Sequence, residues 1–148
     1  MALTNHLGAE QQLLPGKTIV VIGAVVDVAL YSAKRPVSAV DLEARFQLPR
    51  RHLEPAFQAL VREGILVGHR GPRGGYKLAK PRQAISVFDI SEAVKTVETE
   101  KPNKKLPRLL GTVVLTTLAQ ADQCFASALK RITVEDLVQA MTCCPSDN

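Results

Sequence analysis

The sequence contains no tryptophan, and aromatic residues fill only 4% of its 148 positions. Hydrophobic residues still make up 46% of the chain, so a core can form, but it must use aliphatic side chains and alanine. This composition favours packed helices, and the length fits one domain or one domain with an appendage.

Cysteine is scarce and odd in number, with three residues and no secretory pattern around them. These features argue against a disulfide framework and favour a reducing compartment. The most hydrophobic run, at 18–33, is shorter than the roughly 20 residues that a membrane-spanning helix needs, and it contains Asp27. It also begins late for an export signal. We therefore expect a cytoplasmic protein without a membrane partner, in which this run is a buried helix.

No catalytic or metal-binding constellation is visible. The three histidines, His6, His52 and His69, are scattered and lack catalytic or ligand spacing with a carboxylate or thiol. The glycine-rich stretch at 71–75 is followed by Tyr-Lys-Leu and not by the Lys-Ser/Thr of a phosphate-binding loop. We expect no enzyme activity, no metal and no cofactor.

Positive charge is concentrated in one segment. Residues 49–82 hold eight Lys or Arg and two carboxylates, a local charge of +6, whereas the whole chain carries +5. The remaining residues therefore sum to −1. A localised excess of this kind suits a helix and a loop that lie against a polyanion.

Apolar spacing and turn signals predict a mostly α fold with a small β wing. The expected helices cover 17–33, 39–45, 49–63, 84–97 and 106–132, with a hairpin at 65–79 and a final short helix through Met141 that Thr133 caps. The two helices at 39–45 and 49–63, joined by a short turn, form a helix-turn-helix. The hairpin, whose tip is 71–75, makes it a winged one.

Several residues should fix these boundaries. Ser38 and Ser86 each precede an aspartate by three positions, which is a capping-box pattern with Asp in place of Glu. Pro49 suits the first position of its helix. Pro55 predicts a kink or a later helix start, because proline lacks a backbone donor. In the helix at 39–45 and the residue after it, we expect burial of Val40, Leu42 and Phe46.

We divide the chain as follows: an arm at 1–15, a winged helix-turn-helix DNA-binding domain at 16–97, a loop at 98–107, a dimerisation helix and C-terminal helix at 108–141, and a tail at 142–148. The stripe of apolar residues at 106–132 is too long, at about 40 Å, for a small winged domain to cover. A second copy of the chain should cover it as a homodimer. The contact residues that we expect are Leu110, Val113, Val114, Leu118, Ala121 and Phe125.

Three motifs together resemble a known family. RGPRGGYKLAKP at 70–81, HLEPAFQALVREGIL at 52–66 and SVFDISEAV at 86–94 are similar to the Rrf2 type of bacterial winged-helix transcription regulators. The resemblance runs from Lys17 to Met141. It implies a recognition helix in the major groove of DNA and a wing tip in the adjacent minor groove.

The resemblance also implies which residues contact DNA. Glu54 matches a glutamate that can accept a hydrogen bond from the cytosine amine, although a simple surface carboxylate is the alternative. The arginines could equally form a solvated basic face, and for Tyr76 we favour packing against the helix over DNA contact. The expected interface comprises Arg50, Arg51, His52, Glu54, Arg70, Pro72, Arg73, Gly74, Gly75 and Tyr76.

The cysteines depart from the family pattern. Many members hold an iron–sulfur cluster through three cysteines in the loop before the long helix, and here the segment 97–108 contains none. We interpret Cys124 as a small core residue. Cys143 and Cys144 lie in the tail, where a thiol-based redox switch is an alternative to an incidental role.

We conclude that the sequence predicts a homodimeric, sequence-specific DNA-binding transcription regulator, a repressor, that binds a pseudo-palindromic operator. Its partners would be double-stranded DNA, a second copy and, where regulation requires one, an effector that the sequence does not identify. Two alternatives stay open: a winged-helix module for protein assembly, and a regulator that senses redox state through the tail cysteines.

Overall fold

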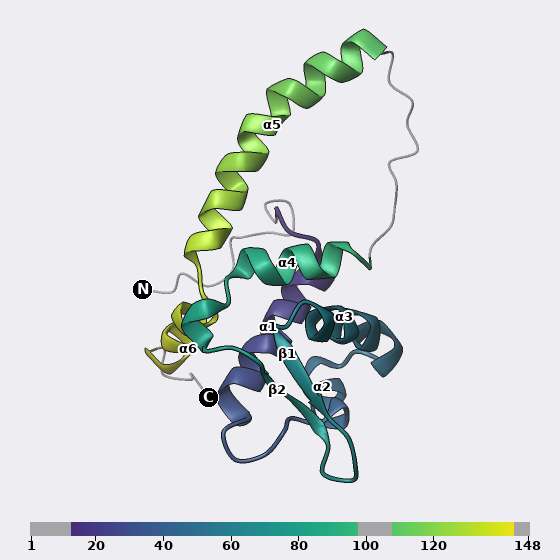
Figure 1. The fold of residues 1–148 in the computed structure, drawn as a ribbon, viewed down its shortest axis with the longest axis vertical. Helices are drawn as coiled ribbons and strands as arrows, with labels where there is room; N and C mark the ends of the chain where they lie inside the picture. The colour runs from purple at the N-terminus through teal and green to yellow at the C-terminus, as the bar shows by residue number, and fades with distance from the viewer. Residues whose placement is uncertain (1–12, 98–107, 144–148) are drawn as a thin grey trace.

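The computed structural model describes residues 13–97 and 108–143 (Figure 1). Within them, the predicted fold class is confirmed: helices dominate, and the sheet has two antiparallel strands. The elements are α1 Gly16–Tyr31, α2 Ala39–Phe46, α3 Arg50–Arg62, β1 Leu66–His69, β2 Gly75–Leu78, the 3-10 turn η2 Arg82–Ala84, α4 Val87–Lys95, α5 Arg108–Arg131 and α6 Val134–Cys143. The expected loop at 98–107 lies outside the described residues, as do most of the arm and the tail.

Helix α1 is the centre of the core. It contacts α2, α4, α6 and β2, and it is apolar around most of its circumference, as expected for a buried helix. Its fully buried side chains include Val21, Val25 and Val28. The one acidic residue, Asp27, accepts a hydrogen bond from Arg45 of α2 at 2.5 Å, which ties the first helix of the helix-turn-helix to the core. The run that starts at 18 thus forms a buried helix, as predicted, but the helix ends at Tyr31 and not at Ala33.

The helix-turn-helix forms, with corrections to its details. Ser38 caps α2 by accepting a hydrogen bond from the backbone N–H of Asp41 at 3.1 Å. Leu42 is buried as predicted, but the expected burial of Val40 is wrong: its side chain is 61% exposed, on the outer face of the first turn. The reversal between the helices comes from Gln47, which adopts a left-handed conformation with φ of 51°.

Helix α3 begins at Arg50, so Pro49 is the residue before the helix and not its first residue. Of the two alternatives predicted for Pro55, a kink or a later helix start, the later start is wrong, because Pro55 lies inside the helix. Leu53, Ala56 and Phe57 hold the helix to the core from its first turn onward. Burial of this apolar face offsets the lost donor of Pro55, which is on the exposed face of the helix.

The wing begins where Gly64 ends α3 with a positive φ of 69°. Its strands pair from Leu66 opposite Leu78 to His69 opposite Gly75. A third segment joins β2, because Val37 and Tyr76 exchange both backbone hydrogen bonds, at 3.0 and 2.8 Å. Val37, two residues before α2, is therefore fixed to the wing. This contact brings the helix-turn-helix and the wing to one side of the molecule.

The fourth helix starts later than predicted, at Val87 and not at Ala84. Ile85 is extended because its carbonyl accepts a hydrogen bond from Val134 at 2.9 Å, while the N–H of Val87 donates to Ile132 at 2.8 Å. The predicted cap at Ser86 and Asp89 is confirmed as a reciprocal capping box. These bonds connect the start of α4 to the start of α6.

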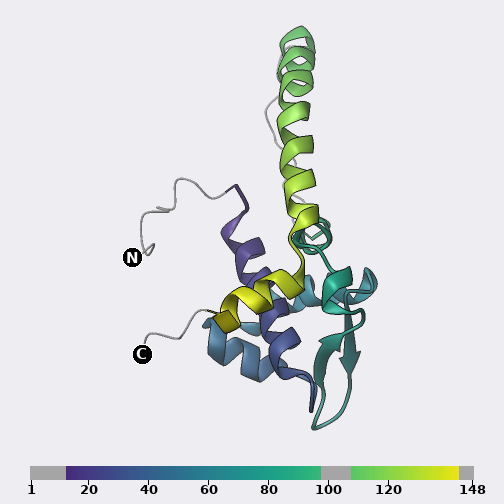
Figure 2. The ribbon, with the colours of Figure 1, turned by 90° about the vertical axis from the view of Figure 1, so that its left-hand side faces the viewer.

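Helix α5 extends away from the body, whereas α6 returns to it and lies against α1 (Figures 1 and 2). Val134 and Val138 of α6 are part of the core. Cys124, which we expected to be a core residue, is exposed in this protomer because α5 has left the body at that point. No helix in the described residues is long and apolar enough to span a membrane.

We predict that Gly75→Ala destabilises the fold. A Cβ atom at this position would lie 2.3 Å from the carbonyl oxygen of Val37, and φ is +155°. The free energy of unfolding should fall by about 1–3 kcal/mol, measured by chemical denaturation. Gly68→Ala is the matched control on the same hairpin, because its Cβ would meet only Tyr76 at an ordinary 3.9 Å. Equal stability of the two variants would contradict the account of the wing.

Candidate nucleic-acid interface

A groove of about 800 Å³ lies between the helix-turn-helix and the wing. The start of α2 lines one side, α3 from Arg50 to Val61 lines the floor, and the hairpin lines the other side. Of the predicted interface residues, those that line the groove are Arg50, Glu54, Arg70, Pro72, Gly74, Gly75 and Tyr76. The fold thus brings together residues that are up to 26 positions apart in the sequence.

The first turns of α3 present side chains in two directions. Arg50 and Glu54, four residues apart, both line the groove and face the wing. Arg51 and His52 are exposed but do not line it. Instead they lie side by side, with Arg51 Nε 3.4 Å from His52 Nε2. The four predicted residues therefore remain accessible: Arg50 and Glu54 line the groove, Arg51 and His52 lie outside it, and Glu54 also neighbours Arg51 on the helix surface.

The outward face of α3 continues one turn further than we predicted. Arg51, Glu54, Pro55 and Gln58 are all exposed and follow helical spacing. Gln58 was missed, although its position four residues after Glu54 could have identified it. An arginine, a glutamate and a glutamine offer hydrogen-bonding groups suited to guanine, cytosine and adenine edges, respectively. This face can therefore carry base recognition.

Tyr76 packs against α3, as we favoured. Its ring centroid lies 4.9 Å from that of Phe57, with the planes tilted by 41°. Burial raises the pKa of the Tyr76 phenol, the negative charge of Glu54 raises it further, and the positive charge of Arg50 opposes both. The hydroxyl group therefore lies near Glu54 and Arg50, two of the charged residues that line the groove. Tyr76 connects the wing to the recognition helix.

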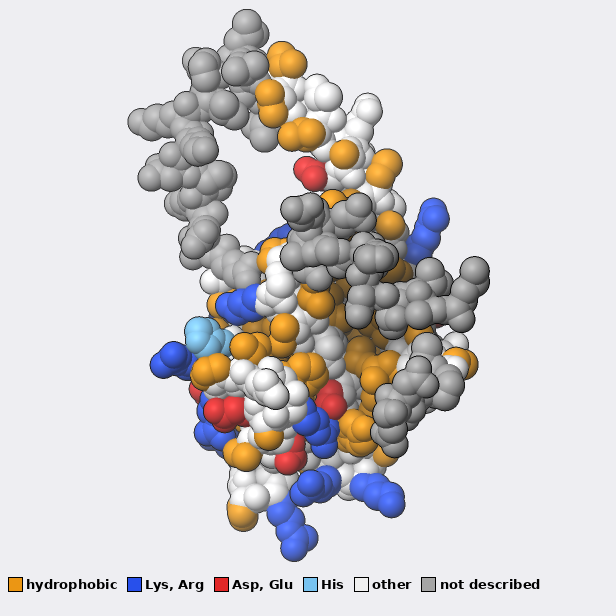
Figure 3. Space-filling view, turned by 180° about the vertical axis from the view of Figure 1, so that it is seen from behind, with side chains coloured by type: hydrophobic (Ala, Val, Ile, Leu, Met, Phe, Trp, Pro, Cys, Tyr) orange, Lys and Arg blue, Asp and Glu red, His pale blue; other side chains and the backbone are white. Residues whose placement is uncertain are grey.

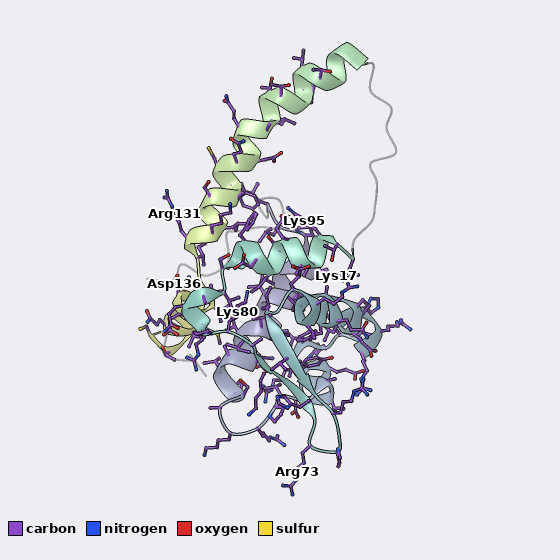
Figure 4. The ribbon with its side chains drawn as sticks, in the orientation of Figure 1. Lys17, Arg73, Lys80, Lys95, Arg131 and Asp136 are labelled. Carbon is purple, nitrogen blue, oxygen red and sulfur yellow. The ribbon has the colours of Figure 1, made fainter. Side chains whose placement is uncertain are left out.

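The wing tip divides into exposed and structural residues. Arg70, Pro72 and Arg73 are exposed, and Arg73 projects from the far end of the hairpin (Figure 4). Gly74 and Gly75 are half-buried, and a Cβ at either would lie 2.3 Å from a backbone oxygen. Glycine is thus required at both positions by backbone packing, before any contact with DNA is considered.

One basic residue in the charged segment has a structural role. The guanidinium group of Arg82 donates to the carbonyl oxygen of Ala29 at 2.9 Å and lies 3.8 Å from Glu135. It links the carboxyl end of α1 to the start of α6, away from the groove. The charge count in the sequence therefore overstates the charge available to a polyanion.

The described thiols do not fit the three-cysteine cluster site that the family resemblance implies. Cys124 lies on α5 and Cys143 at the end of α6, and both are exposed. Within residues 13–97 and 108–143, no three His, Cys, Asp or Glu side chains are grouped to hold a metal ion. We derive no chemistry through such a cluster.

Comparisons with known proteins agree with this arrangement. The model of the Rrf2 family, described as an iron-dependent transcriptional regulator, matches residues 14–140. The chain is 27% identical over 127 residues to protein rrf2 of Nitratidesulfovibrio vulgaris, covering 83% of this chain and 85% of that protein. It is 33% identical over 120 residues to the HTH-type transcriptional regulator IscR of Erwinia tasmaniensis, covering 79% and 73%.

A solved structure is also similar. The structure of IscR from T. potens has a TM-score of 0.68 and 25% sequence identity, covering 90% of this chain and 91% of that one. The family and the regulator from Erwinia tasmaniensis are transcriptional regulators and not enzymes.

We predict that Tyr76 titrates above the ordinary value of about 10. The chain has two tyrosines, so ultraviolet absorbance of a Tyr31→Phe variant reports Tyr76 alone. Because Glu54 raises the pKa of Tyr76, Glu54→Gln in that background should lower the midpoint. A midpoint at or below 10, or one insensitive to Glu54, would show that the hydroxyl group does not lie in the groove.

Proposed function

Because the chain belongs to the Rrf2 family and is a DNA-binding transcription regulator, we propose that it binds a pseudo-palindromic operator as a homodimer and represses transcription. Repression requires no additional protein-binding surface, because a dimer bound across a promoter can block the access of RNA polymerase. A cytoplasmic location, in contact with the chromosome, is part of this proposal.

The exposed face of α3 beside a basic wing is the observation that carries the proposal. In a winged helix-turn-helix the second helix enters the major groove, and its amino-terminal residues meet the base edges. Arg51, Glu54 and Gln58 lie at positions suited to that role. Arg70 and Arg73 at the hairpin tip suit the narrow, electronegative minor groove. Phosphate contacts would position the protein, and the α3 side chains would choose the sequence.

The exposed stripe on α5 supports the homodimer. The α5 helix has 24 residues, so it is about 36 Å long, and it extends away from the body in both ribbon views. Val113 and Leu118 are 56% and 54% exposed. Ala121 is exposed, whereas Val114 and Phe125 are half-buried, and the side chain of Leu110 is outside the described residues. A second α5 packed antiparallel would bury this stripe on both protomers.

Two such protomers would present their α3 helices to the same side of a duplex. The half-sites would then lie about one helical turn, or a multiple of it, apart. We further propose that the protein works without the family's iron–sulfur cluster, since the segment before α5 contains no cysteine. The purified protein should then be colourless in visible light, and a brown protein would contradict this part.

We predict that Glu54→Ala relaxes the preference for one base pair in each half-site. The loss of one specific contact should reduce discrimination there by about 1–3 kcal/mol, measured by competition between single-base operator variants. Glu63→Ala, which removes the exposed carboxylate at the other end of α3, is the matched control. If Glu54→Ala keeps the wild-type preference at every base pair, Glu54 does not read a base.

We also predict that Leu118→Glu makes the protein monomeric. A carboxylate in the apolar stripe would be buried without a partner on dimerisation. The free energy needed to remove its water exceeds the free energy gained from the apolar contact. Sedimentation should give the protomer mass and operator affinity should collapse. Gln123→Glu adds the same charge at an exposed position on the far face of α5 and should leave the dimer intact. A dimeric Leu118→Glu variant would place the interface elsewhere.

A further inference from the structure

A second basic cluster lies beside the wing tip, outside the groove. Lys34 and Arg35, in the turn after α1, approach Arg73 at the tip of the hairpin. Together they surround a hollow of about 670 Å³, whose other lining residues are Pro36, Ser38, Asp41, Pro72 and Gly74. The cluster forms because the Val37–Tyr76 bridge fixes this turn against the wing.

The charges of the cluster are largely uncompensated. Among the described residues, neither Lys34 nor Arg73 forms a salt bridge to a carboxylate. Arg35 lies 3.8 Å from Asp41, but its side chain is 78% exposed, so that pair is weak. Asp41 stays ionised because its hydrogen bond to Ser38, followed by the nearby Arg35 and Arg45, lowers its pKa. Three cations therefore face one carboxylate.

The shape of the cluster fits a backbone phosphate better than a base. Its rim consists of proline, glycine and serine, which allow close approach but offer little to read a base edge. Lys and Arg side chains project from the lower end of the body (Figure 3), which is the end where Arg73 is found in Figure 4. DNA that passes along the groove and the wing tip would continue over this end of the molecule.

We propose that Lys34 and Arg35 bind backbone phosphates of double-stranded DNA just outside each half-site. This inference rests on the proposed function, because it assumes that α3 and the wing engage the operator. The proposal extends the DNA interface to the turn after α1, for which the sequence predicts only the end of a helix. The cluster supplies affinity and salt dependence but no choice of sequence.

The test is a salt titration of operator binding by the full-length Lys34→Ala/Arg35→Ala variant. Two fewer phosphate contacts per protomer should reduce the slope of log K against log salt by about 2 for each bound protomer. Preferences among single-base operator variants should not change. Lys95→Ala/Arg131→Ala is the control, because it removes the same charge from exposed residues distant from the wing (Figure 4). Its slope should stay close to that of the wild type.

Duplex length makes the test sharper. On an operator trimmed to the two half-sites, the wild type and the Lys34→Ala/Arg35→Ala variant should have the same slope, because the flanking phosphates are gone. A Lys34→Arg/Arg35→Lys variant keeps both charges and should behave as the wild type on either duplex, which separates charge from folding.

Two results would overturn the inference. One is a slope for Lys34→Ala/Arg35→Ala equal to that of the control on the long duplex. The other is a loss of slope that persists in full on the trimmed duplex. In both cases a wild type that still prefers its operator leaves the proposed function standing. A wild type that binds all duplexes equally would instead contradict the proposed function.

Discussion

The backbone bridge between Val37 and Tyr76 is the contact on which the DNA-facing side of this molecule depends. It fixes the segment that leads into α2 to the second strand of the wing, so that the helix-turn-helix and the hairpin are held side by side. The bridge leaves no space for a side chain at Gly75. From the other face of β2, Tyr76 packs on Phe57 of α3. A few main-chain and ring contacts thus set the width of the groove between helix and wing.

Helices α1 and α6 support the helix-turn-helix and the wing from two sides of the core. Helix α1 provides the apolar centre, and the Asp27–Arg45 pair holds α2 against it. Helix α6 closes the core from the carboxyl end, through Val134 and Val138 and through the Arg82–Glu135 contact. Among the helices that the structure describes, α5 is the one that leaves an apolar stripe uncovered. The chain therefore contains a winged helix-turn-helix domain that can contact DNA. It also contains a helix, α5, whose uncovered apolar face can join two such domains.

The sequence predicted the helices, the hairpin and the caps at Ser38, Ser86 and Thr133, because each depends on local spacing or on a side chain three residues away. Its errors arose where distant segments decide the structure. The start of α4 was misplaced because Ile85 pairs with Val134. Charge counting assigned Arg82 to the basic segment, although α1 and α6 hold it. The sequence does not connect Lys34 and Arg35 with the DNA-facing surface, because only the fold brings them beside Arg73.

The central claim is that two α3 helices, joined through α5, read one symmetric site. Selection from a random pool of DNA duplexes with the purified full-length protein tests it most directly. The account predicts enrichment of an inverted repeat, with half-site centres about one helical turn, or a multiple of it, apart. Enrichment of a single unpaired half-site, or no enrichment at all, would contradict it.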